Sequence, residues 1–533
     1  MNIPTDLFHW LMAFLPILTL LVLMLGLHLR ATLAAPAGLL AALLSALLVF
    51  RADLQLVAVQ SVKGLWSALT VIIVIWPALL LYEVASQAQA FSAFRAGIRR
   101  LLPNELLQVL AIGLGFVGFL IGITGFGVPV AVGGSLLVGI GVNPLYAVVI
   151  SLIGEAWGST FGTLAVAWDA LRLATGLDSD PALLLRTALW AGLFIWIWNF
   201  IIGAVICWLY GRKEGLKKGL PAILVISAIQ GGGQLLTAQF NQTIACFLPT
   251  CIALVAIFLL GRTPLYRDPW RKEDSPIMDR SLPPAEAEAP PRMSLTQAFV
   301  PYFVLTALTL VVLLIPPVKA FLGQWSFGPA LPETVTGYGY VDPASAAYSP
   351  IAPLTHASLF LLLSSCFALV YYKGHGWIES GSVGGIFRRS LKKTVPSGLA
   401  VAGFLVMSRI MSGSGQTAVL AAGMAAVLGR TYALLSPMVG LLGAFMTSSN
   451  MASNILFSEF QLTTAHLLGL DTAKVLGAQT AGGAIGAATC PGNVVLGTTT
   501  ANILGREGDV LKKTLPVSMA AAVLIGLILL FIV

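Results

Sequence analysis

The sequence has few charged residues and few groups that carry out covalent chemistry. Only 10% of its 533 residues are charged, whereas 57% are hydrophobic. Its five cysteines and five histidines have no metal-ligand spacing, which argues against a metal or haem centre. No His-Glu-x-x-His motif, Gly-x-Ser-x-Gly elbow or GxxxxGK[ST] loop is present, which argues against an enzyme and against direct use of ATP. We therefore expect no catalytic residue, metal or cofactor.

Hydrophobic segments make up most of the chain. Apolar runs of about 18 or more residues, enough to cross a bilayer, recur between residues 8 and 533. A water-soluble globular protein would not carry this composition. We predict an all-α polytopic membrane protein with roughly 12 to 16 membrane segments. The number of crossings between residues 396 and 505 stays open, because the run at 414–428 could span the membrane or lie at its interface.

The basic residues define the expected orientation. A net charge of +8 would suit nucleic acid, but the basic residues are spread over several segments instead of one domain, so no nucleic-acid partner is expected. The positive-inside rule places these segments in the cytoplasm and both termini on the outer side. The segments contain Arg95, Arg99 and Arg100; Arg212, Lys213, Lys217 and Lys218; Arg388, Arg389, Lys392 and Lys393; and Lys512 and Lys513.

Two polar stretches divide the chain. Residues 262–294 contain several prolines with six basic and six acidic residues, which indicates a flexible cytoplasmic linker. The linker would join an N-terminal membrane half, 1–261, to a C-terminal half, 295–533. Residues 318–355 are expected to form an external loop.

The two halves contain a similar pattern. The first has "GFLIGITGFGVPVAVGG" from Gly118, and the second has "GAFMTSSNMASNILF" from Gly443. In each, a helix ends in a break of small or polar residues, an apolar run and a turn follow, and another helix ends in a second break. These features predict two repeats, at about 105–167 and about 432–503.

Matching breaks in two halves are typical of secondary transporters with a binding site near the midplane. An unwound helix frees backbone amides and carbonyls, which are tolerated in a membrane only inside the protein or beside water. The freed amides at a helix start can hold a carboxylate, and glycine lets the anion approach closely. The alternative is that small residues only let helices pack closely. Two matched breaks that contain Thr, Ser and Asn favour the site.

The motifs at these breaks resemble the bacterial lactate permease family, which includes glycolate permeases. The resemblance is carried by "GFGVPVA" at 125–131, "LLVGIGVNPLYA" at 136–147, "SPMVGLLGAFMTSSNMASNILF" at 436–457, "QTAGGAIGAATCPGNVVLG" at 479–497 and "LGREGD" at 504–509. It implies proton-coupled uptake of 2-hydroxymonocarboxylates across the bacterial inner membrane, through a fold of inverted repeats with re-entrant or broken-helix hairpins.

Four positions depart from the family pattern and indicate a divergent member. Ile121 stands where the family has an acidic residue before the first break, and Asn450 stands where the second break usually carries Asp. Conversely, Glu155 replaces a neutral amide and Arg409 replaces Asn. The substrate and the coupling group are therefore open.

Ionisable residues inside apolar spans are functional candidates because they are costly to insert. Glu155 is predicted to carry the coupled proton. For Arg409 three alternatives stand: it binds the substrate carboxylate, pairs with Glu155, or snorkels to the interface. Glu83 and Glu459 are expected at solvated helix ends.

The remaining candidates concentrate at the breaks. Hydroxyl, amide and backbone groups there suit a carboxylate with an adjacent hydroxyl. The expected substrate-binding residues are Thr124, Gly125, Phe126, Gly127, Arg409, Ser448, Ser449, Asn450, Ser453, Asn454, Gln479, Thr480, Thr489 and Asn493.

These features predict a transporter that imports lactate, glycolate or a similar acid by proton symport. The expected partners are the carboxylate, protons and the lipid bilayer, and a homodimer stays open. One alternative is a transporter of another small organic anion with a different coupling ion. A second is an anion channel, since glycine-rich re-entrant segments also form pores.

Overall fold

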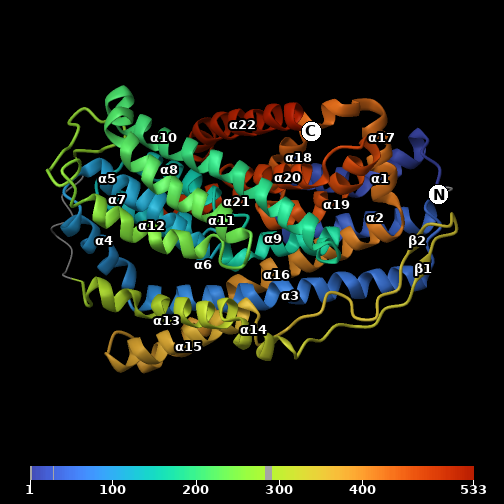
Figure 1. Cartoon of the computed structure of the whole chain (residues 1–533), viewed down its shortest axis with the longest axis horizontal. Coiled ribbons are helices and arrows are strands. Elements are labelled where there is room, and N and C mark those ends of the chain that lie inside the picture. Colours follow the sequence, from blue (N-terminus) through green and yellow to red (C-terminus); the bar gives the residue numbers. More distant parts are fainter. Residues whose placement is uncertain (1–2, 28, 282–290) are drawn as a thin grey trace.

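The structure is a computed structural model that describes residues 3–27, 29–281 and 291–533 (Figure 1). Apart from one pair of two-residue strands, its regular elements are helices, which confirms the predicted all-α membrane class. Ten helices in these ranges are long and apolar enough to cross a membrane by length and composition, and three shorter apolar helices accompany them.

The first half contains sixteen elements as far as residue 260, with π-helical and 3₁₀ turns written as η. They are α1 (Leu7–Leu21), η1 (Val22–Gly26), α2 (Ala31–Leu48), α3 (Leu54–Gln87), α4 (Ala90–Leu101), α5 (Glu105–Leu110), η2 (Ala111–Phe116), α6 (Val117–Ile123), α7 (Val128–Gly139), α8 (Pro144–Ala156), α9 (Gly162–Thr175), η3 (Leu177–Ser179), α10 (Pro181–Ser227) with η4 (Ala228–Gly232) and α11 (Gly233–Ala238), and α12 (Phe247–Leu260).

The second half follows from residue 295. Its elements are α13 (Leu295–Leu314), α14 (Pro316–Gly323), β1 (Thr334–Val335), β2 (Val341–Asp342), α15 (Ala357–Gly374), η6 (Ser380–Ser382), α16 (Val383–Gly413), α17 (Gln416–Leu428), η7 (Gly429–Thr431), α18 (Tyr432–Thr447), α19 (Asn450–Leu468), α20 (Thr472–Ala487), α21 (Pro491–Thr500) and α22 (Glu507–Ile532). The uncertain run at 414–428 is thus a separate helix, α17.

The bundle has two ends with different chemistry. One end holds α4, α5 and the start of α8, and we call it the basic face because Arg95 and Lys513 lie there, beside Gly139 and Tyr146. The other end holds the strands β1 and β2, and we call it the loop face. In Figure 1 the basic face is on the left and the loop face on the right.

The first repeat begins with a hairpin whose tip is the break at 124–127. The arm formed by α5, η2 and α6 is antiparallel to α7, with Gly133 of α7 packed against Val117 of α6. After a turn at 140–143, α8 ends at Ala156 and α9 begins at Gly162, which leaves a second break between them.

The second repeat has the same order. Helices α18 and α19 form a hairpin with its tip at Ser448 and Ser449; Ser453 Oγ donates to the Gly440 carbonyl at 2.7 Å across the two arms. A turn at 469–471 leads to α20, and residues 488–490 separate α20 from α21. Both predicted repeats are therefore re-entrant hairpins followed by a broken helix.

The two repeats enter from opposite ends of the bundle. The turn of the first lies beside the segment that contains Ser275, whose Oγ donates to the Tyr210 carbonyl of α10 at 2.6 Å. The turn of the second contains Asp471, which pairs with Arg186 of α10 at 2.6 Å. Arg186 and Tyr210 are separated by roughly 36 Å along the helix at about 1.5 Å per residue. Because the two turns lie at opposite ends of α10, the two repeats have the predicted inverted arrangement.

One close contact recurs in both repeats. A Cβ added to Gly154 of α8 would lie 1.9 Å from the carbonyl oxygen of Gly113, and one added to Gly482 of α20 would lie 1.9 Å from that of Pro437. Both glycines hold the eleventh position of their helices. Each broken helix therefore crosses its hairpin backbone to backbone, which only glycine permits.

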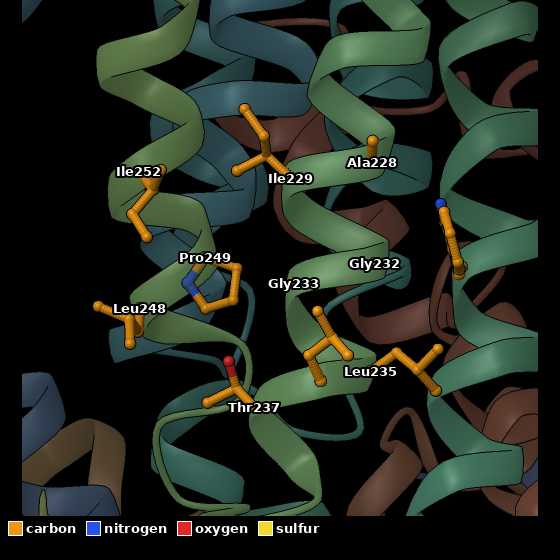
Figure 2. A pocket seen from close by; sticks show the side chains of 11 residues that line it. Ala228, Ile229, Gly232, Gly233, Leu235, Thr237, Leu248, Pro249 and Ile252 are labelled. Carbon is orange, nitrogen blue, oxygen red and sulfur yellow. The ribbon is translucent and has the colours of Figure 1, made fainter.

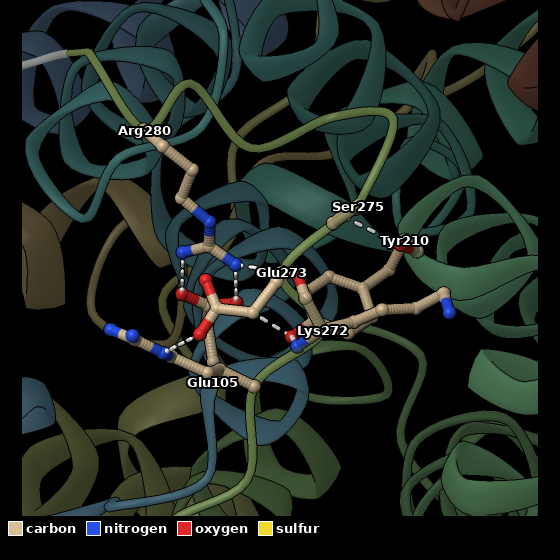
Figure 3. A network of polar contacts seen from close by, with 7 residues as sticks. Glu105, Tyr210, Lys272, Glu273, Ser275 and Arg280 are labelled. Carbon is tan, nitrogen blue, oxygen red and sulfur yellow. Dashed lines mark hydrogen bonds and ion pairs between the residues drawn. The ribbon is translucent and has the colours of Figure 1, made fainter.

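The segment predicted as a flexible linker is packed in its described part. Ile277 is fully buried, and its carbonyl accepts from the Asn143 amide at 2.7 Å. Arg280 holds Glu105 of α5 with two hydrogen bonds of 2.6 and 2.9 Å, and Tyr210 donates to the same carboxylate at 2.6 Å (Figure 3). We call residues 272–280 the linker clamp. Residues 282–290 of the predicted linker lie outside the described residues.

Candidate functional site

The breaks of both repeats meet around one small cavity. Its volume is about 80 Å³, and it is lined from four sides by Gly125 and Phe126; Glu155, Ser159, Gly162 and Thr163; Ser448, Ser449 and Asn450; and Ala487 and Asn493, with Ile121, Val166, Ala167 and Met451 between them. Polar groups from chain segments more than 300 residues apart thus face one cavity.

The first hairpin tip is shaped by two residues in the left-handed region. Phe126 has φ +59° and Gly127 has φ +79°. A Cβ on Gly127 would lie 2.4 Å from Leu496 and 3.2 Å from the Asn493 side-chain oxygen, so glycine is required for both conformation and space. The tip therefore packs directly on α21 of the other half. Gly127 lies behind the cavity instead of lining it.

The second break of the first repeat, at the start of α9, also has left-handed backbone conformations. Thr163, Leu164 and Ala165 have φ values of +51°, +52° and +73°, and none of them is glycine. Such conformations are costly for residues with a Cβ and cluster at functional sites. Here they turn the Thr163 side of the chain toward the cavity.

Glu155 is the one carboxylate in the cavity lining. It is 4% exposed, and Asn493 Nδ2 donates to its Oε1 at 3.5 Å. Its Oε2 is buried with no hydrogen-bond partner. Ile121 lines the same cavity. A buried acid with a free oxygen and no adjacent base can take up a proton or receive a donor.

The second hairpin tip presents hydroxyl groups and a helix start. Ser448 has φ +57°, and its Oγ accepts from the Gly492 amide at 3.0 Å, which joins this tip to α21. Ser449 caps α19 by accepting from the Ala452 amide at 3.3 Å. The positive end of the α19 dipole therefore faces the cavity, where it favours an anion.

A chain of hydrogen bonds connects the halves behind the cavity. Asn450 Nδ2 donates to Thr160 Oγ1 at 3.1 Å, and Thr160 Oγ1 lies 3.1 Å from Thr480 Oγ1. Asn454 Nδ2 donates to Thr480 Oγ1 at 2.9 Å and to the Ala167 carbonyl at 2.9 Å. The side-chain oxygens of both asparagines are buried without partners. This network fixes Asn450 relative to the first repeat.

Four other predicted residues lie in the layer around the cavity. Gln479 Nε2 is 3.3 Å from Ser453 Oγ, and its Oε1 accepts from Gln461 at 2.9 Å. Thr124 and Thr489 donate to backbone carbonyls of their own helices, at 3.3 and 2.8 Å. These groups support the breaks and do not line the cavity.

Arg409 lies away from the cavity, at the loop face. Its guanidinium donates to the Leu173 carbonyl at the end of α9 and lies 5.7 Å from the centre of the Tyr348 ring. The alternative in which Arg409 pairs with Glu155 is therefore wrong. Its guanidinium also points inward to a buried carbonyl, so it does not snorkel. A role in substrate binding at the cavity stays a prediction that its position does not favour.

Two carboxylates expected at solvated helix ends are partnered inside the protein. Glu83 is 4% exposed and pairs with Arg389 at 2.9 Å and Lys393 at 2.5 Å. Glu459 accepts from Ser412, and its second oxygen is buried without a partner. Both expectations are wrong, because the partners come from α16, more than 300 residues after Glu83 and about 50 before Glu459.

Three hydroxyl residues of the cavity or its network were absent from the predicted set: Ser159, Thr160 and Thr163. They form the hydroxyl-rich part of "GSTFGT" at 158–163. The same rule that selected Ser448 and Ser449, hydroxyls at a small-residue break, would have found them.

A larger hollow lies elsewhere and has different chemistry. It measures about 410 Å³ and lies between the η4 and α11 region and α12, where Leu248, Pro249 and Ile252 face Gly233 and its neighbours (Figure 2). Ile252 and Leu236 are 52% and 68% exposed, and Thr237 supplies the only side-chain hydroxyl of the lining. An apolar groove open to the lipid-facing surface does not suit an anion.

The chain is similar over most of its length to known proteins. The model of a family described as L-lactate permease matches residues 9–533. The L-lactate permease of Salmonella typhimurium is 26% identical and covers 97% of this chain and 94% of its own. Glycolate permease GlcA of Escherichia coli is 27% identical with the same coverage. A crystal structure of the Alcanivorax borkumensis YdaH transporter overlaps 86% of this chain and 85% of that one, at 15% identity and a TM-score of 0.39.

Proposed function

Because this chain belongs to the L-lactate permease family, we propose that it is a secondary active transporter that imports a small 2-hydroxymonocarboxylate by proton symport. One observation carries the proposal: two hairpin tips and two broken helices enclose a cavity that contains a single buried carboxylate, Glu155. Lactate and glycolate, named in the relatives' descriptions, are the first substrates to test.

The cavity supplies the groups that a 2-hydroxy acid needs. The helix start at Asn450 directs backbone amides and a positive dipole end toward the cavity, and these favour a carboxylate. The hydroxyls of Ser159 and Thr163 can pair with the substrate hydroxyl on the opposite side. Ile121, Val166 and Met451 form the apolar wall against the substrate carbon chain.

Glu155 is the coupling group in this proposal. A charge at this depth without a cationic partner is costly, so the carboxyl releases its proton only when water or a donor reaches it. Proton loss to one side and proton gain from the other would then accompany substrate passage. Asn493 of α21 contacts Glu155 at 3.5 Å. Through this contact, a change in the protonation of Glu155 would affect α21 of the second repeat.

The positive-inside rule places the basic face in the cytoplasm and the loop face outside the bacterial inner membrane. Both termini are then external. Channel activity is the competing function. Saturable counterflow separates the two, because a channel does not couple the anion to an ion gradient and does not show saturable exchange of internal for external substrate.

The test is uptake of labelled lactate and glycolate into proteoliposomes at two pH values, with and without sodium. In the unchanged protein we expect saturable uptake that rises with an inward proton gradient. In Glu155→Gln we expect pH-driven accumulation to fall to background while exchange of internal for external substrate continues, because the amide keeps the shape but not the proton.

Glu333→Gln is the matched control, since Glu333 is an exposed carboxylate of the external loop. Equal loss of accumulation and exchange in Glu155→Gln would make Glu155 a structural or substrate-binding group. Accumulation driven by sodium alone would contradict proton coupling.

A further inference from the structure

A cluster of four charged residues lies at the loop face, outward of the cavity. It consists of Lys63 of α3, Asp342 of β2, Arg409 of α16 and Glu459 of α19, and we call it the loop-face cluster. Two cations face two anions, so the set is neutral as it stands. Only Asp342 comes from the external loop; the other three belong to helices of the bundle.

Asp342 is bound as a small carboxylate ligand would be. One of its oxygens accepts from Gln60 at 2.5 Å and from the Lys63 ammonium. Lys63 and Gln60 are 5% and 1% exposed, so a built polar site lies beneath a loop residue. Tyr348 of the same loop covers both cations, with its ring centre 5.5 Å from Lys63 Nζ and 5.7 Å from Arg409.

The loop that carries Asp342 has little regular structure of its own. Its strands β1 and β2 have two residues each, and it lies along the outer end of α3 (Figure 1). If the loop lifts, Lys63 and Arg409 face only Glu459, and the site has a net positive charge. A buried cation without its partner favours any anion that can reach it.

The loop-face cluster is connected to the cavity by two helices. Arg409 holds Leu173, six residues along α9 from Ala167 in the cavity lining, which is roughly 9 Å at 1.5 Å per residue. Glu459 lies nine residues along α19 from Asn450, or roughly 14 Å. The loop-face cluster therefore lies roughly 9 to 14 Å from the cavity along these helices.

The geometry points to a second carboxylate site at the loop face, in which Asp342 holds the place of a small monocarboxylate anion that binds to Lys63 and Gln60 when the loop lifts. The site is the first station of an anion that approaches from the loop face. The inference rests on the proposed function only in taking the transported anion to be a carboxylate.

The experiment measures thermal stability of the full chain in lipid nanodiscs while sodium formate replaces sodium chloride at constant ionic strength. In Asp342→Ala we expect a lower midpoint and a saturable rise with formate about threefold larger than in the unchanged protein, because the free anion refills the vacated place. Glu333→Ala, in the same loop, is the matched control and should respond as the unchanged protein does.

The double variant Lys63→Met with Asp342→Ala should lose the additional formate response. An equal response of Asp342→Ala and Glu333→Ala, or a response retained without Lys63, would overturn the inference. If Asp342→Ala yields no folded protein, Asp342→Ser enters the same titration, since it also vacates the place of the carboxylate and keeps a polar side chain.

Transport separates this inference from the proposed function. A formate response that persists in a protein that transports no carboxylate would leave the loop-face site standing and remove the proposed function. Carboxylate transport with no additional formate response in Asp342→Ala would remove the loop-face site and leave the proposed function standing.

Discussion

The two hairpins enter the bundle as inverted copies, yet their turns are held by different forces. At the basic face the first turn pairs with the linker clamp through backbone hydrogen bonds, from Asn143 to Ile277 at 2.7 Å and from Asp279 to Gly141 at 2.8 Å. At the loop face the second turn has Asp471, paired with the exposed Arg186 at 2.6 Å and with Lys474 at 3.6 Å.

This difference indicates which hairpin is the mobile one. Exposed ion pairs are typically worth about 0 to 1 kcal/mol, whereas a buried strap with several hydrogen bonds adds the burial of Ile277 to each bond. The first hairpin is therefore tied through the linker clamp to the scaffold helix α10. The turn of the second hairpin is held by the ion pairs of Asp471, and α19 also accepts a hydrogen bond from Ser412 at Glu459. We expect the larger movements at this turn.

The largest expected effect is on the feature that the two repeats share. Alanine at Gly154 or at Gly482 would place a Cβ 1.9 Å from a backbone oxygen and force the broken helix off its hairpin in either half. We expect both variants to lose most monodisperse protein in size-exclusion chromatography.

Gly384→Ala in α16 is the control for this pair, because a Cβ there would meet nothing within 4 Å. If one repeat accepts alanine and the other does not, the two helix crossings are not equivalent. The two repeats then do not share this close contact.

A smaller effect is expected from opening the linker clamp. Arg280→Ala removes the two charge-assisted bonds to Glu105, which should raise hydrogen exchange at residues 139–143 about tenfold. Asp471→Asn should change exchange at residues 468–472 by less, because the pair at 2.6 Å has a partner, Arg186, that is exposed to solvent, and the second pair is long at 3.6 Å.

Arg271→Ala serves as the control in the linker, since Arg271 pairs only with the exposed Glu273 in the described structure. Equal exchange at the two turns before and after these changes would remove the asymmetry between the hairpins.

The smallest effect concerns acid at the loop face. Burial, with the charge of Arg172 on α9 as a second cause, lowers the pKa of His356 to about 4. The unfolded chain therefore binds this proton more readily, and stability falls as pH drops from about 6.5 toward 4. In His356→Gln this part of the acid destabilisation should disappear, seen as a smaller fall of the thermal midpoint between pH 7 and 4.5.

Uptake measurements provide a second test of His356→Gln. Between pH 5 and 8 the imidazole stays neutral, so the pH profile of uptake should be the same in His356→Gln as in the unchanged protein. A shifted profile would mean that the loop face, and not the cavity, sets the pH dependence.

Sequence patterns identified the breaks because the cause of a break is local. Glycines, prolines and hydroxyl residues within a short stretch weaken a helix wherever they occur, so the tips at 124–127 and 448–449 could be predicted. The class of fold followed from hydropathy for the same reason. The inverted relation of the halves was implied by the family resemblance.

Pairings between distant segments could not be predicted in this way. Arg409 has a carboxylate candidate in Glu155 and another in Glu459, and nothing in either local sequence indicates which helix lies beside it. The packing of Ile277 depends on a turn more than 130 residues earlier in the chain. Such contacts are decided by tertiary geometry, which a single sequence leaves undetermined.

The reversed turn in α9 has a consequence for energetics. Three successive residues with a Cβ, Thr163, Leu164 and Ala165, are held in the left-handed region, and at roughly 1 to 2 kcal/mol each they store roughly 3 to 6 kcal/mol. A two-state equilibrium moves from 1:99 to 99:1 with about 5.5 kcal/mol. The wall of the cavity thus stores backbone strain. The free energy released when this strain relaxes is comparable to the free energy that shifts the site between two conformations.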